Sequence, residues 1–212
     1  MVVIGLGRFG SGVARALTAL GHDVLALDNN ADVVQAHAGA LGHVVQADTT
    51  DIETLKQLGV GEFKHAVVSI GQNLEASVLT ILNLSQIGIK DIWAKANSRQ
   101  HGRIAERVGA HHVVFPESDM GQRVAHLVTG KMIDFIEFED DFAIAKTRAP
   151  SETHGKPLSQ SAVRTRHGVT VVGIKRRHQD FIYAKADTVV QPGDLLIVAG
   201  PTRAIERFAA RV

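Results

Sequence analysis

The chain has 212 residues, 45% of them hydrophobic, which is enough for one large domain or two small ones with a real core. Its formal net charge of +1 excludes a global basic excess of the kind that favours nucleic-acid binding. The chain has no cysteine, which excludes disulfides, thiol nucleophiles and thiolate metal sites and is compatible with a cytoplasmic protein. We expect no signal peptide before the first strand, and no apolar run approaches the roughly 20 residues that cross a bilayer.

The first predicted strand, over residues 2–4, runs directly into a glycine-rich loop. Gly5, Gly7 and Gly10 have the spacing GxGxxG and lead into a predicted helix over residues 9–20. In this context the glycines allow a tight turn, close approach of the backbone to phosphate, and close packing of helix on strand. The start of the helix directs unsatisfied N–H groups at the anion. The loop therefore predicts a nucleotide site, against the alternative of a turn that serves packing alone.

Apolar, strand-like segments then alternate with amphipathic, helix-like segments up to about residue 115. The strands lack polar alternation, as expected when helices cover both faces of a parallel sheet. Six strands are expected, over residues 2–4, 24–27, 44–46, 66–70, 92–95 and 112–115. Five helices are expected, over residues 9–20, 33–40, 52–58, 74–87 and 101–108. This pattern predicts an α/β fold with a doubly wound, parallel Rossmann sheet in the order 3-2-1-4-5-6.

The pattern changes after Pro116. One amphipathic crossover helix is predicted over residues 120–132, followed by a small α+β unit. In that unit we expect strands over residues 134–139, 142–146, 169–175, 181–184 and 195–198, and helices over residues 159–166 and 203–210. The basic run Lys175–His178 is interpreted as a solvated hairpin turn. The predicted domains are a Rossmann nucleotide-binding domain with its crossover helix, residues 1–133, and a C-terminal domain, residues 134–212.

Polar residues follow the predicted strands of the first domain at their carboxyl ends, which face one crevice in this fold. Asp28 ends the second strand, where its carboxylate would bind a ribose. The other residues expected to cradle adenosine are Asn29, Ala47, Asp48, Thr49, Ser69, Ile70, Gly71, Gln72 and Asn73. Asp48 could instead cap the helix that follows it, and Asn73 has the same ambiguity.

Two cations and one carboxylate are expected to lie near the phosphates of the ligand. Arg8 follows the second glycine, so its guanidinium can contact phosphates, although it could also be a solvent-exposed part of the loop. Because a terminal phosphate carries more charge than a dinucleotide pyrophosphate, Arg8 favours ATP or ADP. Lys95 ends the fifth strand and is expected to point into the crevice, the alternative being outward past the edge of the sheet. Glu117 would repel phosphates unless a divalent cation lay between them; the alternative is that Glu117 and Asp119 simply favour the first turn of a helix.

Four motifs together resemble the RCK (TrkA-N/TrkA-C) subunits of bacterial Trk/Ktr potassium uptake systems, most closely the Ktr type. They are Gly5–Gly10 with Asp28, Ser69–Asn73, Trp93–Ala96 and Phe115–Gly121. The resemblance covers the full length of the chain. It implies that the residues Gly5, Gly7, Arg8, Phe9, Gly10, Asp28 and Lys95 bind the nucleotide. Within this set the glycines would hold the phosphates, Arg8 would sense the terminal phosphate, and Glu117 would bind a divalent cation such as Mg²⁺.

The resemblance also implies a function. It predicts a non-catalytic, cytoplasmic regulatory subunit, peripheral at the inner face of the cell membrane, that assembles into an octameric ring beneath a membrane-embedded potassium-translocating partner. ATP would activate and ADP would inactivate by changing the shape of the ring. The segment around Val163 and Arg164 resembles the region that binds cyclic di-AMP in some relatives. The rival reading is an NAD(H)-binding redox sensor or an NAD-dependent oxidoreductase, the latter requiring a substrate domain that the short C-terminal unit does not suggest.

Overall fold

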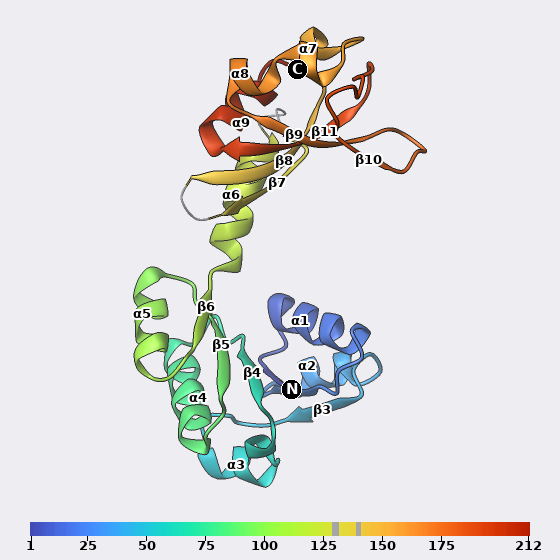
Figure 1. Ribbon diagram of the computed structural model, residues 1–212. Coiled ribbons are helices and arrows are strands. Elements are labelled where there is room, and N and C mark those ends of the chain that lie inside the picture. The colour runs from blue at the N-terminus through green and yellow to red at the C-terminus, as the bar shows by residue number, and fades with distance from the viewer. Residues whose placement is uncertain (129–131, 139–140) are drawn as a thin grey trace. The chain divides into compact units, whose positions relative to one another are not determined.

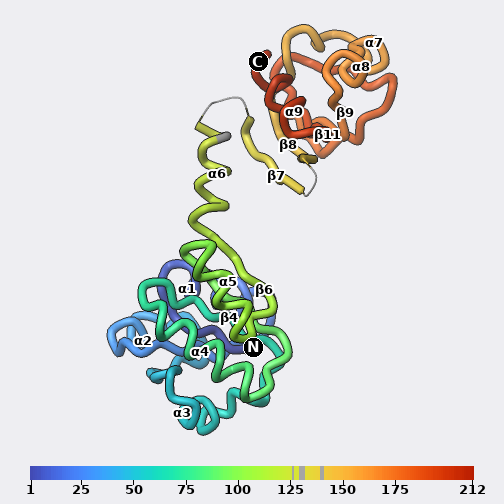
Figure 2. The backbone as a smooth tube through the Cα atoms, turned by 90° about the vertical axis from the view of Figure 1, so that its left-hand side faces the viewer, coloured from blue at the N-terminus to red at the C-terminus, as the bar shows by residue number. Residues whose placement is uncertain are grey.

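The computed structural model describes residues 1–128, 132–138 and 141–212 of the chain (Figure 1). These residues divide into two compact units, Met1–Ser118 and Asp119–Val212. The path of the chain through both units can be followed in Figure 2. The division falls inside helix α6 (Pro116–Val128), whereas the domains predicted from the sequence meet at residues 133 and 134. None of the described helices is long and apolar enough to span a membrane.

The first unit contains a six-stranded parallel sheet in the order β3-β2-β1-β4-β5-β6, which confirms the predicted Rossmann topology. Its strands are β1 (Val2–Ile4), β2 (Leu25–Asp28), β3 (His43–Gln46), β4 (His65–Val68), β5 (Asp91–Lys95) and β6 (His112–Val114). Its helices are α1 (Arg8–Ala19), α2 (Ala31–His37), α3 (Ile52–Gln57), α4 (Leu74–Ile87) and α5 (Arg99–Arg107), with a 3-10 turn, η1, at Val60–Glu62. Each predicted element of this unit is present, with bounds shifted by a few residues at most.

Helices cover both faces of this sheet, so its central strand is buried on both sides. Val3 packs in one cluster of buried side chains with Ala14 of α1, while Val2 and Ile4 pack in the other with Leu84 of α4. Successive side chains of a strand point to opposite faces, which explains why β1 is apolar throughout. Each such burial stabilises the fold by about 1.5–3 kcal/mol. The same close packing fixes the carboxyl end of β1, where the glycine loop begins.

The second unit contains a five-stranded antiparallel sheet in the order β10-β9-β11-β8-β7. Its strands are β7 (Asp134–Phe138), β8 (Phe142–Arg148), β9 (Thr170–Lys175), β10 (Phe181–Tyr183) and β11 (Leu195–Pro201). Its remaining elements are η2 (Ser151–Thr153), α7 (Leu158–Ser161), α8 (Val163–His167) and α9 (Thr202–Ala209). The buried face packs around Phe208 of α9, which is fully buried. This unit is the predicted α+β domain; the last residue of its first predicted strand, Glu139, lies outside the described residues.

Two predicted helices differ from the observed ones. Helix α6 begins at Pro116, four residues before the predicted start, because proline fits the first turn of a helix, where its missing N–H is not needed. Residues 129–131 of the predicted helix lie outside the described part of the chain. The predicted helix over 159–166 is two short helices, since Ala162 has a left-handed φ of 51° that interrupts the helical backbone. Val163 is consequently buried in the core of the second unit, and Arg164 is exposed.

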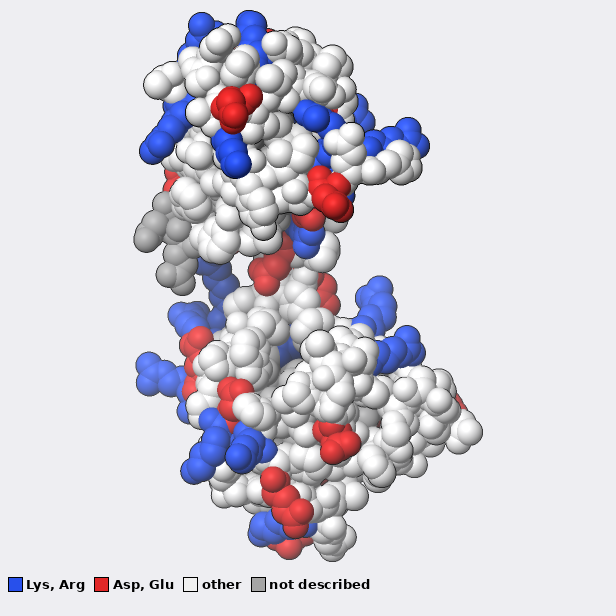
Figure 3. Space-filling view, turned by 45° about the vertical axis from the view of Figure 1, so that its right-hand side comes forward, with Lys and Arg blue, Asp and Glu red and all other residues white. Residues whose placement is uncertain are grey.

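The basic run after β9 is a hairpin, but the prediction that it is solvated is wrong for one of its residues. Arg176 Nε donates to Asp194 Oδ1 at 2.8 Å, and Arg176 Nη2 donates to Asp194 Oδ2 at 3.0 Å. The Asp194 side chain is only 1% exposed, and the backbone N–H of Gln191 also donates to it. This bidentate pair ties the β9–β10 hairpin to the turn before β11. Elsewhere on the face in Figure 3, cationic and anionic side chains are interspersed, in agreement with the near-zero net charge.

Candidate nucleotide site

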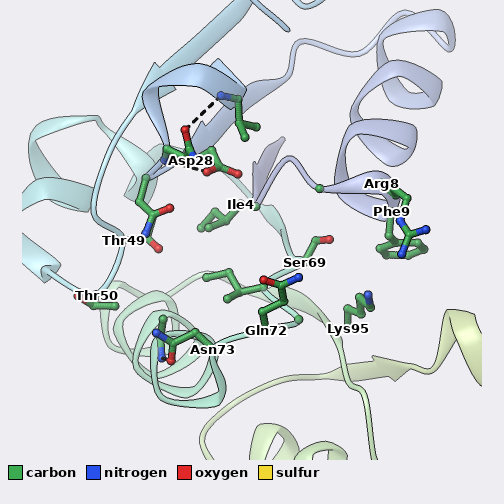
Figure 4. A pocket seen from close by; sticks show the side chains of 18 of the residues that line it. Ile4, Arg8, Phe9, Asp28, Thr49, Thr50, Ser69, Gln72, Asn73 and Lys95 are labelled. Carbon is green, nitrogen blue, oxygen red and sulfur yellow. Dashed lines mark hydrogen bonds between the residues drawn. The ribbon is translucent and has the colours of Figure 1, made fainter. Parts of the chain in front are cut away.

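An open crevice with a volume of about 480 Å³ lies at the carboxyl ends of the central strands of the first unit (Figure 4). Every predicted nucleotide-binding residue of this unit lines it except Gly10. These lining residues are Gly5, Gly7, Arg8, Phe9, Asp28, Asn29, Asp48, Thr49, Ser69, Ile70, Gly71, Asn73, Lys95 and Glu117, together with Gln72. The crevice volume is within the range of small-molecule sites, roughly 300–1,000 Å³.

Ala47 lines the crevice, as expected, and five further lining residues were not predicted. They are Ile4, Asn30, Val33, Thr50 and Ala76. Most of them are direct neighbours of predicted residues, so the signal that could have found them is their position next to a strand end. Ile4 and Ala47 are apolar, and they add non-polar surface to the otherwise polar lining of the crevice.

The glycine loop has the geometry that the motif predicts. Gly5 has a φ of +88°, which favours glycine, and it follows β1 directly. A Cβ on Gly10 would lie 1.9 Å from the carbonyl oxygen of Gly5, so only glycine lets α1 pack this closely on the loop. A Cβ on Gly7 would meet nothing within 4 Å, which leaves open space in front of the loop backbone. Gly10 thus allows α1 to pack closely on the loop, while Gly5 and Gly7 line the crevice.

The start of α1 has unused hydrogen-bond donors, unlike the starts of the next four helices. Gly7 is the N-cap of α1, makes no side-chain cap bond, and is followed by no acidic residue in the first turn. Each of the next four helices has an N-cap side chain that accepts from its first N–H groups. The caps are Asn30 for α2, Asp51 for α3, Asn73 for α4 and Ser98 for α5. The first N–H groups of a helix need acceptors, and here an anion in the crevice can supply them.

Asp28 holds the other end of the crevice. Its Oδ2 accepts from the backbone N–H of Leu6 at 2.7 Å, and its Oδ1 accepts from the backbone N–H of Asn30 at 2.9 Å. Each carboxylate oxygen keeps a further lone pair for a hydroxyl donor. Asp28 therefore fixes the glycine loop to the end of β2 and remains available for the ribose contact that was predicted for it.

Lys95 points into the crevice, as expected, and it is paired there. Its Nζ lies 2.5 Å from Glu117 Oε1, and its side chain is 12% exposed against 63% for Glu117. The hydrogen bond from Lys95 is the largest cause that holds the pKa of Glu117 below its usual value, and the charge of Arg8 adds a smaller contribution in the same direction. Glu117 is thus ionised in the first turn of α6 and lies close to both cations.

Three predicted contacts are resolved by the structure. The cap of α3 is Asp51 and not Asp48, whose Oδ1 instead accepts from the N–H and hydroxyl of Thr50. Asn73 combines both of its predicted roles, because it caps α4 and lines the crevice. Thr49 is 5% exposed, and its hydroxyl bonds Thr80 of α4 at 2.8 Å, so its hydroxyl is already used within the protein.

Charged groups lie toward both ends of the crevice, and the end that holds Arg8 and Lys95 also holds the Glu117 carboxylate paired to Lys95. Figure 4 shows Arg8 and Lys95 toward one end and Asp28 with Thr49 toward the other, with Ile4 and Ser69 between them. A phosphate chain fits the end with two cations and the uncapped helix, and a ribose fits the end with the carboxylate. Among the described residues, no group of three or more His, Asp or Glu side chains is arranged to hold a metal ion. A cation at Glu117 would therefore need phosphate oxygens as further ligands.

The parallel sheet, the glycine loop and the charged crevice define a two-domain protein whose Rossmann domain is built for a nucleotide-like ligand. The TrkA-N domain family matches residues 1–116, and the TrkA-C domain family matches residues 143–212. The chain belongs to the RCK family of proteins that combine these two domains, which confirms the resemblance found in the motifs.

Two potassium uptake proteins are similar to the chain over nearly all of its length. The chain is 37% identical over 211 residues to Ktr system potassium uptake protein C of Bacillus subtilis, covering 99% of this chain and 96% of that protein. It is 36% identical over 200 residues to Ktr system potassium uptake protein A of Vibrio alginolyticus, covering 94% and 91%.

Solved structures agree on the fold. The GsuK RCK domain superimposes with a TM-score of 0.66 at 18% identity, covering all of this chain and 47% of that one. The GsuK channel bound to NAD superimposes with a TM-score of 0.65 at 20% identity, covering 98% and 39%. This chain therefore spans less than half the length of the GsuK chains it matches.

Proposed function

We propose that the chain is the nucleotide-sensing regulatory subunit of a bacterial potassium uptake system. Its similarity to the Ktr proteins extends over more than nine-tenths of both chains. The comparison therefore supports a role of the whole protein and not of a single domain. In this proposal the subunit is cytoplasmic and lies at the inner face of the membrane through a membrane-embedded, potassium-translocating partner. It acts as a homo-oligomeric, octameric ring.

The uncapped start of α1 with two cations at one end of the crevice, and Asp28 at the other, carry the proposal that the ligand is an adenine nucleotide. The backbone at Gly7 and the uncapped start of α1 would hold the phosphates, with Arg8 and Lys95 neutralising their charge. Asp28 would accept from the ribose hydroxyls. Mg²⁺, when bound between Glu117 and phosphate oxygens, would supply the charge that keeps the carboxylate from repelling the ligand.

ATP and ADP would act oppositely through their different affinities for two shapes of the ring. A ligand shifts a conformational equilibrium only by its differential affinity, so the sensing groups must contact the part of the ligand that differs. Arg8 is exposed at the start of α1 and meets this requirement for a terminal phosphate. The role is sensing and not catalysis, and we expect negligible ATP hydrolysis by the purified chain. Cyclic di-AMP at Arg164 of α8 would be a separate, second input.

An NAD(H)-binding redox sensor is the second candidate. Its support is that the GsuK channel, part of which has the same fold as this chain, has been solved bound to NAD. The Shewanella denitrificans Kef C-terminal domain, at a TM-score of 0.53, is an AMP-bound form and favours neither candidate. A dinucleotide would use the same glycine loop and Asp28, but it would leave Arg8 and Lys95 with less phosphate charge to neutralise.

Calorimetric titration of the purified chain separates these candidates. ATP, ADP, NAD⁺ and NADH are each titrated with and without Mg²⁺. Tighter binding of ATP and ADP than of either dinucleotide is expected, with Mg²⁺ strengthening ATP most. Preference for NADH would replace the adenine-nucleotide proposal with the redox sensor. Rapid ATP hydrolysis in the same samples would contradict the sensing role.

A further inference from the structure

His101 is a buried histidine beside the crevice that the proposed nucleotide contacts do not use. It lies in the first turn of α5 and is 5% exposed. Its backbone N–H donates to the hydroxyl of Ser98, the N-cap of that helix, at 3.1 Å. The position of the imidazole is therefore set by the start of α5 and not by a flexible loop.

Both ring nitrogens of His101 are hydrogen-bonded. Nδ1 accepts from the backbone N–H of Asn97 at 3.4 Å, and Nε2 lies 3.1 Å from the hydroxyl oxygen of Ser77, which is fully buried. A backbone N–H can only donate, so Nδ1 must be without a proton. The ring is then neutral, with its one proton on Nε2 directed at Ser77. Burial lowers the pKa of His101, in agreement with a neutral ring.

The two partners of His101 belong to the two chain segments that form one wall of the crevice. The side-chain amide of Asn97 donates to the carbonyl oxygen of Gly71, which lines the crevice. Ser77 follows Ala76, another lining residue, in the first turn of α4. His101 thus connects the first part of α4 to the β5–α5 connection, which follows Lys95, the last residue of β5.

The two hydrogen-bond partners of the imidazole are uncharged. From α4 it faces the Ser77 hydroxyl, and from the β5–α5 connection it faces the Asn97 N–H. Burial is the cause of its lowered pKa, without a contribution from a charged neighbour. The elements packed against α5 carry charged or titratable groups at Glu75 of α4, Asp91 and Lys95 of β5, and His112 of β6, and α5 itself carries Arg99 and Arg103.

We propose that His101 is a positioning residue of the nucleotide site, whose neutral ring holds the crevice wall in the ligand-binding arrangement and whose protonation weakens nucleotide binding. A proton on Nδ1 would oppose the donor N–H of Asn97 and break the bond that orients this segment toward Gly71. Proton and nucleotide would then compete, and the affinity would fall by up to about tenfold for each pH unit once the free protein protonates. The inference rests on the proposed nucleotide binding.

The test compares the pH dependence of ADP affinity in three proteins. Calorimetric titrations with ADP run from about pH 8 to about pH 5.5 on the wild-type chain, on His101→Asn and on His22→Asn. An asparagine at 101 keeps an acceptor near the position of Nδ1 but cannot take up a proton in this range. His22 is exposed and serves as the matched control. Protonation of the nucleotide itself affects all three proteins equally.

We expect wild type and His22→Asn to lose affinity at acidic pH more steeply than His101→Asn, by up to about tenfold over the range. Equal slopes for all three proteins would overturn this inference alone, and absence of ADP binding at about pH 8 would overturn the proposed function together with it. Should His101→Asn not fold, nuclear magnetic resonance titration of the wild-type imidazole replaces it. Saturating ADP must then move the His101 titration to lower pH, and an unmoved titration would overturn the inference.

Discussion

The crevice of the first unit and the hairpin of the second unit both collect charged residues, but they use them differently. In the second unit the buried carboxylate of Asp194 takes two hydrogen bonds from Arg176 and one from Gln191. In the crevice, Arg8 is exposed and the first N–H groups of α1 have no side-chain cap. Polar groups that satisfy one another stabilise a fold, whereas polar groups held open by a rigid scaffold are available to a ligand. Substitutions in the two regions should therefore affect different measurements.

The largest expected effect is on the stability of the second unit. Arg176→Met leaves the Asp194 carboxylate, 1% exposed, without its cation, and loss of one partner of a buried pair costs about 3–5 kcal/mol. Arg177→Met, at the exposed neighbouring position, is the control and should stay within about 0.5 kcal/mol of wild type. Urea unfolding measures both, and calorimetry should find nucleotide binding by the folded protein unchanged. Equal stability of the two variants would contradict the closed-pair interpretation.

A pair of glycine variants in α1 tests the scaffold of the crevice. Gly10→Ala places a Cβ 1.9 Å from the Gly5 carbonyl oxygen, and relieving this clash should cost about 1–3 kcal/mol and abolish nucleotide binding. Gly12→Ala adds the same methyl group to the same helix in open space, where it should stabilise by roughly 0.5–1 kcal/mol. Thermal unfolding and nucleotide titration of both variants check the opposite signs. A Gly10→Ala protein that still binds nucleotide would show that the loop does not need this close packing.

Arg8→Ala should change binding without changing stability. Loss of one charge-assisted contact to phosphate should weaken ATP binding by about tenfold, or about 1.4 kcal/mol, and weaken ADP binding less. The free energy of unfolding should stay within about 0.5 kcal/mol of wild type, because Arg8 is exposed. Arg15→Ala, on the same helix and also exposed, is the matched control. An equal loss for ATP and ADP would argue against a contact with the terminal phosphate.

The smallest effect is expected for a closed cluster in the first unit itself, at the amino ends of β4, β5 and β6. Asp91 accepts from His65 at 2.7 Å and lies 3.2 Å from His112. The hydrogen bond from His65 is the largest cause that lowers the pKa of Asp91 from its ordinary value of 3.8. A lowered carboxyl pKa contributes stability above the ordinary value and loses it as the pH falls through the lowered one.

Wild type should therefore be more stable than Asp91→Asn at about pH 5, and the difference should disappear as the pH falls below 3.8. Thermal unfolding across this range measures the difference, with Asp32→Asn as an exposed control. Nucleotide affinity should not change, because Asp91 is at the opposite ends of the strands from the crevice. A difference in stability that is independent of pH would show that ionisation of Asp91 is not its source.

Local signals in the sequence were sufficient to predict the helices and strands of the first unit. Helix α4 begins after the cap Asn73 and ends at Gly88, whose φ is +94°, so its predicted bounds are the observed ones. The parallel topology then implies that residues at the strand ends lie together, which is how most of the crevice could be predicted. What could not be predicted depends on contacts between distant segments. The pair of Arg176 with Asp194 and the bond of Thr49 to Thr80 have no local pattern, and the left-handed Ala162 is an unusual conformation for a residue with a side chain.

The single tryptophan and the single tyrosine of the chain lie in different units. Trp93 lies in β5 of the first unit and stacks on His112, with 4.2 Å between the ring centroids. Tyr183 lies in β10 of the second unit and is 75% exposed. Selective excitation of the indole therefore reports the first unit alone. The unfolding of that unit can be followed in the unmodified full chain without attaching a dye.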